Sequence, residues 1–276
     1  MSELRAALEA ALGPIYRIER EVRPVGNCRL FVAVGTPAAP ELLVKVLPAE
    51  LSLAVDARAF EREVVLLADR LGHAAIVAPR GAGRAGAVVY HTRRFVEGTT
   101  LRAWLTNHGE LPLRRAVEIL RDVLTALAHA HHATIAHGDL KPENVFLAGG
   151  RARVADAGVV DAVERTLSGG ASPPGAVRAA LCAPAYLAPE RRDDGSPGGP
   201  RDDMFAVGVL LHEMLTGRPP AGEAEGLEEV RALPPWLVAL ARRCLAEEPA
   251  ARWPDAAAAL EVVTRSAGGG GAGSVG

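Results

Sequence analysis

Lysine is almost absent from this sequence. Of its 31 basic residues only two are lysines, Lys45 and Lys141, and all the others are arginines. The arginine guanidinium is a planar fork, whereas the lysine ammonium is a compact point charge, so neither replaces the other where a single charge must be placed. We therefore expect the two lysines to lie where an ammonium is needed.

Cysteines and long apolar runs are also scarce. Cys28, Cys182 and Cys244 are far apart and form no CxxC pair, which argues against a zinc cluster or a disulfide framework and favours a reducing, cytoplasmic location. No uncharged apolar run approaches the roughly 18–20 residues that span a bilayer. The charged, mixed first ten residues do not resemble a secretory signal. We expect no membrane segment in this chain.

The overall charge argues against a nucleic-acid-binding protein. The formal net charge of the 276 residues is −2, and no stripe rich in arginine or lysine stands out. A dedicated nucleic-acid partner is therefore not expected, because such binders usually present a basic face. Hydrophobic residues make up 49% of the chain and charged residues 23%, enough apolar content to build a core. The length suits one large domain or two lobes.

Two patterns of hydrophobic residues divide the chain. The first third predicts strands over 16–22, 30–34, 42–47 and within 76–95, with turns at 23–29 and 81–86. It also contains helix-like segments at 1–12 and 56–71, the latter with apolar residues at helical spacing. Later segments predict helices over 101–107, 113–132, 202–215, 236–245 and 253–265, with an irregular region between 150 and 200.

We therefore predict an α+β fold of two lobes. A small strand-rich lobe would comprise residues 1–96, a larger helical lobe residues 97–265, and a cleft would lie between them. The Gly-rich residues 266–276 are expected to form a flexible tail.

The strongest chemical motif is the segment 137–144, HGDLKPEN. A carboxylate, a lysine two residues on and an asparagine three further on is the layout of a phosphoryl-transfer loop. Asp139 could accept the proton of an incoming hydroxyl, Lys141 could neutralise the transferred group, and Asn144 could hold a metal ion. Asp156 follows in a DAG segment. Asp156 and Asn144 together would supply the oxygen ligands that Mg²⁺ prefers.

These motifs resemble those of the eukaryotic-type Ser/Thr protein kinase domains found in bacteria, over about residues 16–265. The segment 42–45, LLVK, resembles the family's strand lysine motif, and Glu63 matches the glutamate of the next helix. Further matches are the APE segment at 188–190, Asp203 of a central helix, and Arg252, which in the family pairs with the APE glutamate.

The resemblance implies roles for these positions in binding ATP and Mg²⁺. Lys45 would grip the nucleotide's phosphates, and Glu63 would orient Lys45, although Glu61 is an alternative partner. The nucleotide would lie against a hinge that contains Arg94 and Val96. At the Gly-rich loop only Gly26 remains, since the three glycine positions hold Arg23, Val25 and Cys28. Val25 and Gly26 would cover the phosphates, less closely than a loop of glycines.

Other positions that depart from the family pattern bear on how the kinase would be activated. Arg93 stands where the family has an apolar residue before the hinge. Its stem could pack on apolar surface with the head in solvent, or it could lie near Glu63 and compete with Lys45 for it. Ala157 replaces a phenylalanine, Ala183 a threonine and Gly138 an arginine. Phosphate acceptors in the loop that follows Asp156 could be Thr166, Ser168 or Ser172.

Three functions follow from this reading. The first is a kinase that transfers the ATP γ-phosphoryl group to Ser or Thr of a protein. The second is a pseudokinase, a scaffold that docks a partner protein with or without bound ATP. The third is a small-molecule kinase, against which Lys141, the APE segment and Arg252 favour the protein-kinase branch.

Overall fold

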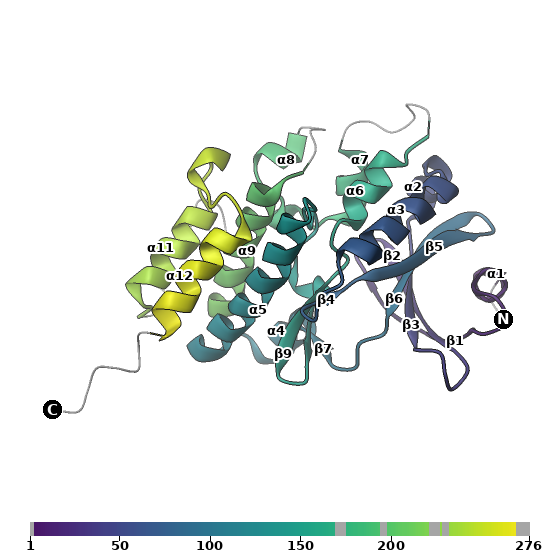
Figure 1. The fold of residues 1–276 in the computed structure, drawn as a ribbon, viewed down its shortest axis with the longest axis horizontal. Helices are drawn as coiled ribbons and strands as arrows, with labels where there is room; N and C mark the ends of the chain where they lie inside the picture. Colours follow the sequence, from purple (N-terminus) through teal and green to yellow (C-terminus); the bar gives the residue numbers. More distant parts are fainter. Residues whose placement is uncertain (1–2, 169–174, 194–197, 221–226, 228–231, 269–276) are drawn as a thin grey trace.

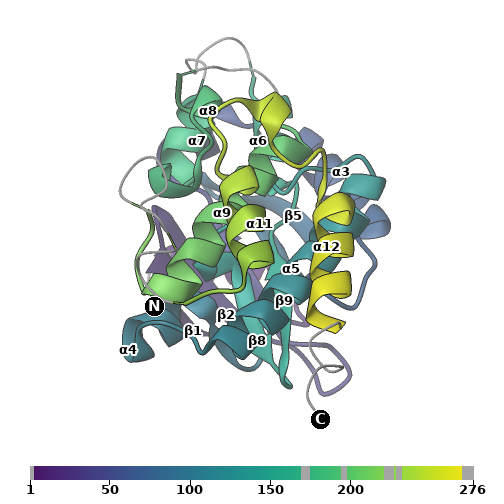
Figure 2. The same ribbon diagram turned by 90° about the vertical axis from the view of Figure 1, so that its left-hand side faces the viewer.

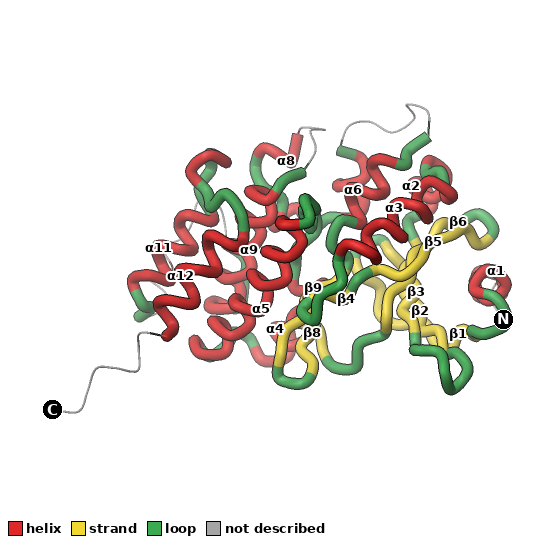
Figure 3. Tube along the Cα trace, in the orientation of Figure 1, coloured by secondary structure: helices red, strands yellow, loops and turns green. Residues whose placement is uncertain are grey.

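Most strands lie toward one end of the molecule, with a few helices beside them, and the other end is helical (Figures 1 and 3). The computed structural model describes residues 3–168, 175–193, 198–220, 227 and 232–268. The expected division into a strand-rich and a helical lobe is confirmed, and the site described below lies between the two.

The strand-rich lobe is built on a five-stranded antiparallel sheet of order β1-β2-β3-β6-β5. Its strands are β1 (Arg17–Val25), β2 (Cys28–Val34), β3 (Leu42–Val46), β5 (Pro79–Ala85) and β6 (Val88–Arg94). Both predicted turns are shorter than expected. Strand β1 continues to Val25, and β2 already begins at Cys28. Strand β5 runs through the Gly-rich segment to Ala85. Pairing with a neighbouring strand overrides the weak strand preference of glycine and proline here.

Three helices flank this sheet. Helix α1 (Glu3–Leu12) buries Leu8 among apolar side chains of β1, β2 and β3. Helix α3 (Ala57–Arg70) packs Phe60, Val64 and Leu67 into the main core. Asp56 caps α3, because its side chain accepts hydrogen bonds from two free backbone N–H groups of the first turn. The short helix α2 (Ala49–Ala54) precedes α3 and was not predicted.

The helical lobe surrounds one long, central helix. Helix α5 (Leu113–His132) lies beside α9 (Pro200–Thr216) and α12 (Ala256–Gly268), and α11 (Pro235–Cys244) packs against α9 (Figure 2). Helix α4 (Leu101–His108) follows the hinge. These helices lie close to their predicted positions. Helix α12 continues to Gly268, so the first three residues of the predicted tail are helical, and its remaining residues lie outside the described part of the chain.

A second, small sheet lies where the lobes meet. It contains β4 (Ile76–Val77), β7 (Thr99–Thr100), β8 (Val145–Ala148) and β9 (Arg151–Ala155), in the order β4-β9-β8-β7. The β8–β9 hairpin begins directly after Asn144 and ends directly before Asp156. It thereby brings the two predicted metal-binding residues to the same end of one hairpin.

The region from 150 to 200 is more regular than predicted. After β9 it contains helices α6 (Val159–Arg165), α7 (Ala176–Leu181) and α8 (Glu190–Asp193). Each has only four to seven residues, too few to give a clear apolar period in the sequence. Among the helices of the described residues, none is both long and apolar enough to cross a membrane.

Candidate active site

The loop before β8 gathers three predicted catalytic residues. Asp139, Lys141 and Asn144 are all buried. The Lys141 Nζ donates to Asp139 Oδ1 at 2.8 Å and lies 2.7 Å from Oδ2. The Asn144 amide nitrogen donates to the Asp139 carbonyl oxygen at 2.8 Å and to its Oδ2 at 3.1 Å. The carboxylate of Asp139 is therefore fixed from two sides.

Asp203 of α9 holds this loop in place. Its Oδ2 accepts from the His137 backbone N–H at 2.7 Å, and its Oδ1 accepts from the Gly138 N–H at 3.0 Å. The ring of His131 contacts the same carboxylate at 2.9 Å. Burial would raise the pKa of Asp203, but its hydrogen bond to His131 and the nearby histidines lower it. Asp203 thus fixes the backbone of the catalytic loop from the buried side of α9.

Lys45 and Asp156 form a second buried ion pair. The Lys45 Nζ donates to Asp156 Oδ2 at 2.8 Å. Asp156 has φ 65°, a left-handed conformation that aspartate tolerates better than most residues. Burial would lower the pKa of Lys45 and raise that of Asp156, but their mutual attraction dominates. The pKa of Lys45 is held above its usual value and that of Asp156 well below it, so both remain charged.

Arg93 also reaches Asp156. Its Nε lies 3.3 Å from Asp156 Oδ1, and its guanidinium lies over the ring of Phe146 at 4.5 Å from the centroid. Neither expectation for Arg93 is correct. The head is buried, with the residue only 6% exposed, and its partner is Asp156 instead of Glu63. Phe146, the second residue of β8, was not singled out in the sequence because a lone aromatic in a strand is ordinarily a core residue.

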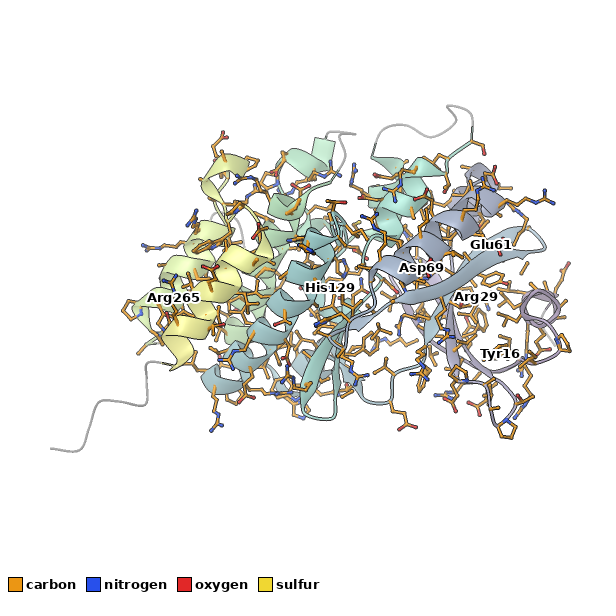
Figure 4. All side chains as sticks on the ribbon, viewed as in Figure 1. Tyr16, Arg29, Glu61, Asp69, His129 and Arg265 are labelled. Atoms are coloured by element: carbon orange, nitrogen blue, oxygen red, sulfur yellow. The ribbon has the colours of Figure 1, made fainter. Side chains whose placement is uncertain are left out.

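The predicted pair between Glu63 and Lys45 is absent, although both residues are described. Glu63 Oε2 lies 3.0 Å from Arg165 Nε and 2.9 Å from its Nη2. Arg165 belongs to α6, which lies beside α3 (Figure 1). The alternative partner, Glu61, is exposed on α3 (Figure 4). The only carboxylate within ion-pair distance of Lys45 among the described residues is that of Asp156.

A cavity of about 560 Å³ joins the Lys45–Asp156 pair and Arg93 to Asn144, but neither Asp139 nor Lys141 is among its lining residues. It is lined at one end by Val25 and Gly26 of the β1–β2 turn and at the other by Lys45, Asn144 and Asp156. The hinge contributes Phe95 and Val96 to this cavity. Arg94 does not line it, because alternate residues of a strand point to opposite faces, and lies instead on a groove behind the hinge.

The oxygen atoms of Asp156 and Asn144 fit a magnesium ion, and their hydrogen bonding is the observation that supports this. Asp156 Oδ1 is buried, and the described residues offer it no hydrogen bond, since the Arg93 contact is an ion pair without hydrogen-bond geometry. Asn144 uses its amide nitrogen in both of its hydrogen bonds, which leaves the amide oxygen for a metal. One carboxylate oxygen and one amide oxygen suit a hard cation that also binds phosphate oxygens.

The segment after Asp156 covers the catalytic loop. Lys141 Nζ donates to the Leu181 carbonyl oxygen at 2.9 Å, at the end of α7. Asn27 of the β1–β2 turn donates to the Ala180 carbonyl oxygen at 3.2 Å. These contacts hold the C-terminal end of α7 against the catalytic loop and the β1–β2 turn.

The possible phosphate acceptors of this segment differ in accessibility. Thr166 is buried, and its hydroxyl donates to the Ala162 carbonyl oxygen at 2.7 Å. Ser168 is exposed, and its backbone N–H donates to the Ala54 carbonyl oxygen at 2.7 Å. Ser172 lies outside the described residues. In this arrangement the Thr166 hydroxyl cannot accept a phosphoryl group.

The predicted pair between Glu190 and Arg252 is confirmed. The two Nη atoms of Arg252 contact the two Glu190 carboxylate oxygens at 2.6 and 2.8 Å. Arg252 is fully buried and also donates to the carbonyl oxygens of Ala246 and Glu247. This bidentate pair joins the APE segment to the far end of the helical lobe.

A five-stranded sheet beside a helical lobe, with a buried lysine–aspartate pair in the cleft between them and a second aspartate in the catalytic loop, defines the class of protein kinases. Sequence comparison agrees, since the model of the protein kinase domain matches residues 32–261. The chain therefore belongs to the protein kinase domain family.

Its relatives include bacterial Ser/Thr protein kinases. The chain is 34% identical over 205 residues to the serine/threonine-protein kinase PknL of Mycobacterium tuberculosis, which covers 68% of this chain and 50% of PknL. It is 31% identical to PrkC of Bacillus subtilis over 208 residues, which covers 74% of this chain and 31% of PrkC. The chain thus spans half or less of the length of these two relatives.

Solved structures share the fold. The PknI kinase domain of Mycobacterium tuberculosis, as a double mutant, superposes with a TM-score of 0.74 at 23% identity and covers 92% of this chain and 96% of that one. Rad53 residues 1–466, solved in complex with AMP-PNP, superpose with a TM-score of 0.67 at 22% identity and cover 89% of this chain and 64% of that one.

Proposed function

We propose that this chain transfers the γ-phosphoryl group of Mg-ATP to serine or threonine hydroxyls of a protein. One observation carries the proposal. The chain has two lysines, and each is buried against a loop aspartate, Lys45 against Asp156 in the cleft and Lys141 against Asp139 in the catalytic loop. Where arginine is otherwise used throughout, two ammonium groups buried against loop carboxylates, one of them lining the cavity, indicate a site that handles phosphate.

The proposed mechanism is mainly positioning and charge neutralisation. Asp139, held by Lys141 and Asn144, would orient the acceptor hydroxyl and accept its proton. Lys45 would contact the nucleotide's phosphates, and Lys141 would offset charge on the transferred group. Mg²⁺ held by Asp156 and Asn144 would neutralise the phosphate oxygens.

The nucleotide would occupy the cavity between the proposed lobes, residues 1–96 and 97–265. Val25, Gly26 and Val96 line that cavity, and the Arg94 backbone belongs to the same hinge. Glu63 would join the site only after leaving Arg165. All three cysteines are free, which suits a reducing compartment such as the cytoplasm. The acceptor would be a protein, with no role for nucleic acid.

One observation favours a pseudokinase instead. Both oxygens of Asp156 face cations, and Glu63 is held away from Lys45. A scaffold could keep this arrangement permanently, with the partner protein docked on an inactive cleft.

Transfer of label from γ-labelled ATP in the presence of Mg²⁺ separates the two functions. The assay uses a generic basic protein acceptor, with a small-molecule acceptor in a parallel arm. We expect label on protein with the unmodified chain and none with Asp139→Ala or Lys45→Ala, while Arg265→Ala, a substitution of an exposed arginine on α12, retains the label. ATP binding without transfer in the unmodified chain would favour the pseudokinase.

A further inference from the structure

Arg93 places a second cation on the carboxylate that is to bind the metal. Lys45 takes Asp156 Oδ2 at 2.8 Å, and Arg93 Nε lies 3.3 Å from Oδ1. Oδ1 is the oxygen without a hydrogen bond and is therefore the one left for a metal. Arg93 thus occupies the side of Asp156 that a divalent cation would approach.

The contact between Arg93 and Asp156 is an ion pair without hydrogen-bond geometry. The Arg93 Nε, like Asp156 Oδ1, has no hydrogen-bond partner in the described part of the chain. The guanidinium has one long hydrogen bond, from Nη1 to the Arg94 carbonyl oxygen at 3.4 Å, and it lies over the Phe146 ring. Because no hydrogen bond joins Arg93 to Asp156, a divalent cation that reaches the carboxylate oxygen can compete with the guanidinium for it.

We propose that Arg93 competes with the divalent cation for Asp156 and so sets the Mg²⁺ concentration at which the cleft binds nucleotide. This inference rests on the proposed function, because it assumes that Asp156 is a metal ligand. A guanidinium stays charged in proteins. A metal ion bound to Oδ1 would therefore repel the Arg93 guanidinium at close range and tend to drive it away from the carboxylate.

The neighbours of Asp156 support this assignment to Arg93. Besides Lys45 and Arg93, His91 also interacts electrostatically with its carboxylate. Burial lowers the pKa of His91 to about 4, so its ring is neutral at physiological pH. Lys45 contacts the other oxygen and is the residue expected to hold phosphate. Removing Arg93 would leave Lys45 as the one cation paired with the Asp156 carboxylate. Oδ1 would then be available to a metal ion.

The test measures binding, with Arg93→Met as the variant. Methionine has an unbranched stem like that of arginine, and an apolar residue at this position matches the family pattern. The probe is a fluorescent ATP analogue at fixed concentration, titrated with Mg²⁺, and a parallel arm titrates Mn²⁺ alone, followed by electron paramagnetic resonance. We expect the half-saturating concentration of either metal to fall at least about fivefold, because a like charge is removed a few ångströms from the metal.

Two variants control for other effects. Arg80→Met removes an exposed arginine from the neighbouring strand β5 and should leave both metal midpoints within about twofold, since exposed charges are screened. Arg93→Lys keeps a cation at the site and should retain a midpoint closer to that of the unmodified chain. Affinity for the analogue without metal should change less than about twofold in Arg93→Met, whereas a merely structural role would weaken it.

Several results would overturn the proposal. These are unchanged metal midpoints in Arg93→Met, an equal shift in Arg80→Met, or no Mn²⁺ binding by either protein. If Arg93→Met does not fold, Arg93→Gln takes its place with the same criteria. The Mn²⁺ arm needs neither nucleotide nor transfer. A shifted Mn²⁺ midpoint in a chain that transfers no label would therefore uphold the role of Arg93 and contradict only the kinase activity.

Discussion

Glu63 of α3 pairs with Arg165 of α6, at 2.9 to 3.0 Å, and not with Lys45. Helix α6 begins directly after Gly158, whose φ of 75° lies in the left-handed region. A Cβ at Gly158 would come within 2.7 Å of a Leu67 methyl group. The absence of a side chain at Gly158 therefore lets α6 approach α3 closely enough for Arg165 to hold Glu63.

The pair between Glu63 and Arg165 should restrain activity. Both side chains are partly exposed, at 29% and 53%, and such an ion pair contributes about 0–1 kcal/mol. Arg165→Ala should therefore raise the initial rate of phosphoryl transfer, by up to about fivefold. Arg62→Ala, on an exposed face of α3, is the matched control and should leave the rate unchanged. A rate in Arg165→Ala that is equal to or below that of the unmodified chain would show that α6 does not restrain Glu63.

His91 should make the fold sensitive to acid. Its ring is fully buried, and neither ring nitrogen has a hydrogen-bond partner among the described residues. Burial lowers its pKa from 6.5 to about 4. Between these values the unfolded chain binds a proton that the folded chain does not, so the free energy of unfolding falls as pH decreases from 6.5 towards 4. The loss attributable to His91 should approach about 3 kcal/mol.

His91→Phe checks this pH dependence by urea unfolding at pH 7 and pH 4.5. Phenylalanine keeps the edge-to-face contact with Phe60 and removes two buried nitrogens. The variant should be as stable as the unmodified chain at pH 7 and lose less stability at pH 4.5. Parallel losses in the two proteins would assign the acid sensitivity to other groups.

Arg252 should be a major determinant of stability. It is fully buried, with Glu190 and several backbone carbonyl oxygens as partners. Arg252→Ala leaves these acceptors unpaired and should lower the free energy of unfolding by about 3–5 kcal/mol, as expected when one partner of a buried pair is removed. Arg265→Ala, on the exposed side of α12, should change it by less than about 0.5 kcal/mol. Denaturant unfolding of both variants gives the comparison, and similar values would contradict the assigned role.

Much of the fold was predictable because its signals are local. The apolar period of the segment 113–132 predicts α5 with the bounds observed. The HGDLKPEN motif predicts the catalytic loop, since its residues contact one another within a few positions of the chain. The pairing of Glu190 with Arg252 followed from the family resemblance and not from any local pattern.

The ion pairs of Arg93 with Asp156 and of Glu63 with Arg165 were not predictable from the sequence. Arg93 and Asp156 are far apart in sequence, as are Glu63 and Arg165, and only tertiary packing, such as that of α6 against α3, brings each carboxylate to its cation. Charge alone allows Lys45 either Glu63 or Asp156. The short helix α6 carries too few apolar positions to reveal its place beside α3.

The role of Asp156 tests the account most directly. The measurement is the initial rate of γ-phosphoryl transfer from Mg-ATP to a protein acceptor by the unmodified chain and by Asp156→Asn, with binding of the ATP analogue measured in parallel. We predict measurable transfer by the unmodified chain and a rate at least about 100-fold lower in Asp156→Asn, with the analogue still bound. Equal rates in the two proteins, or no transfer by either, would contradict the account.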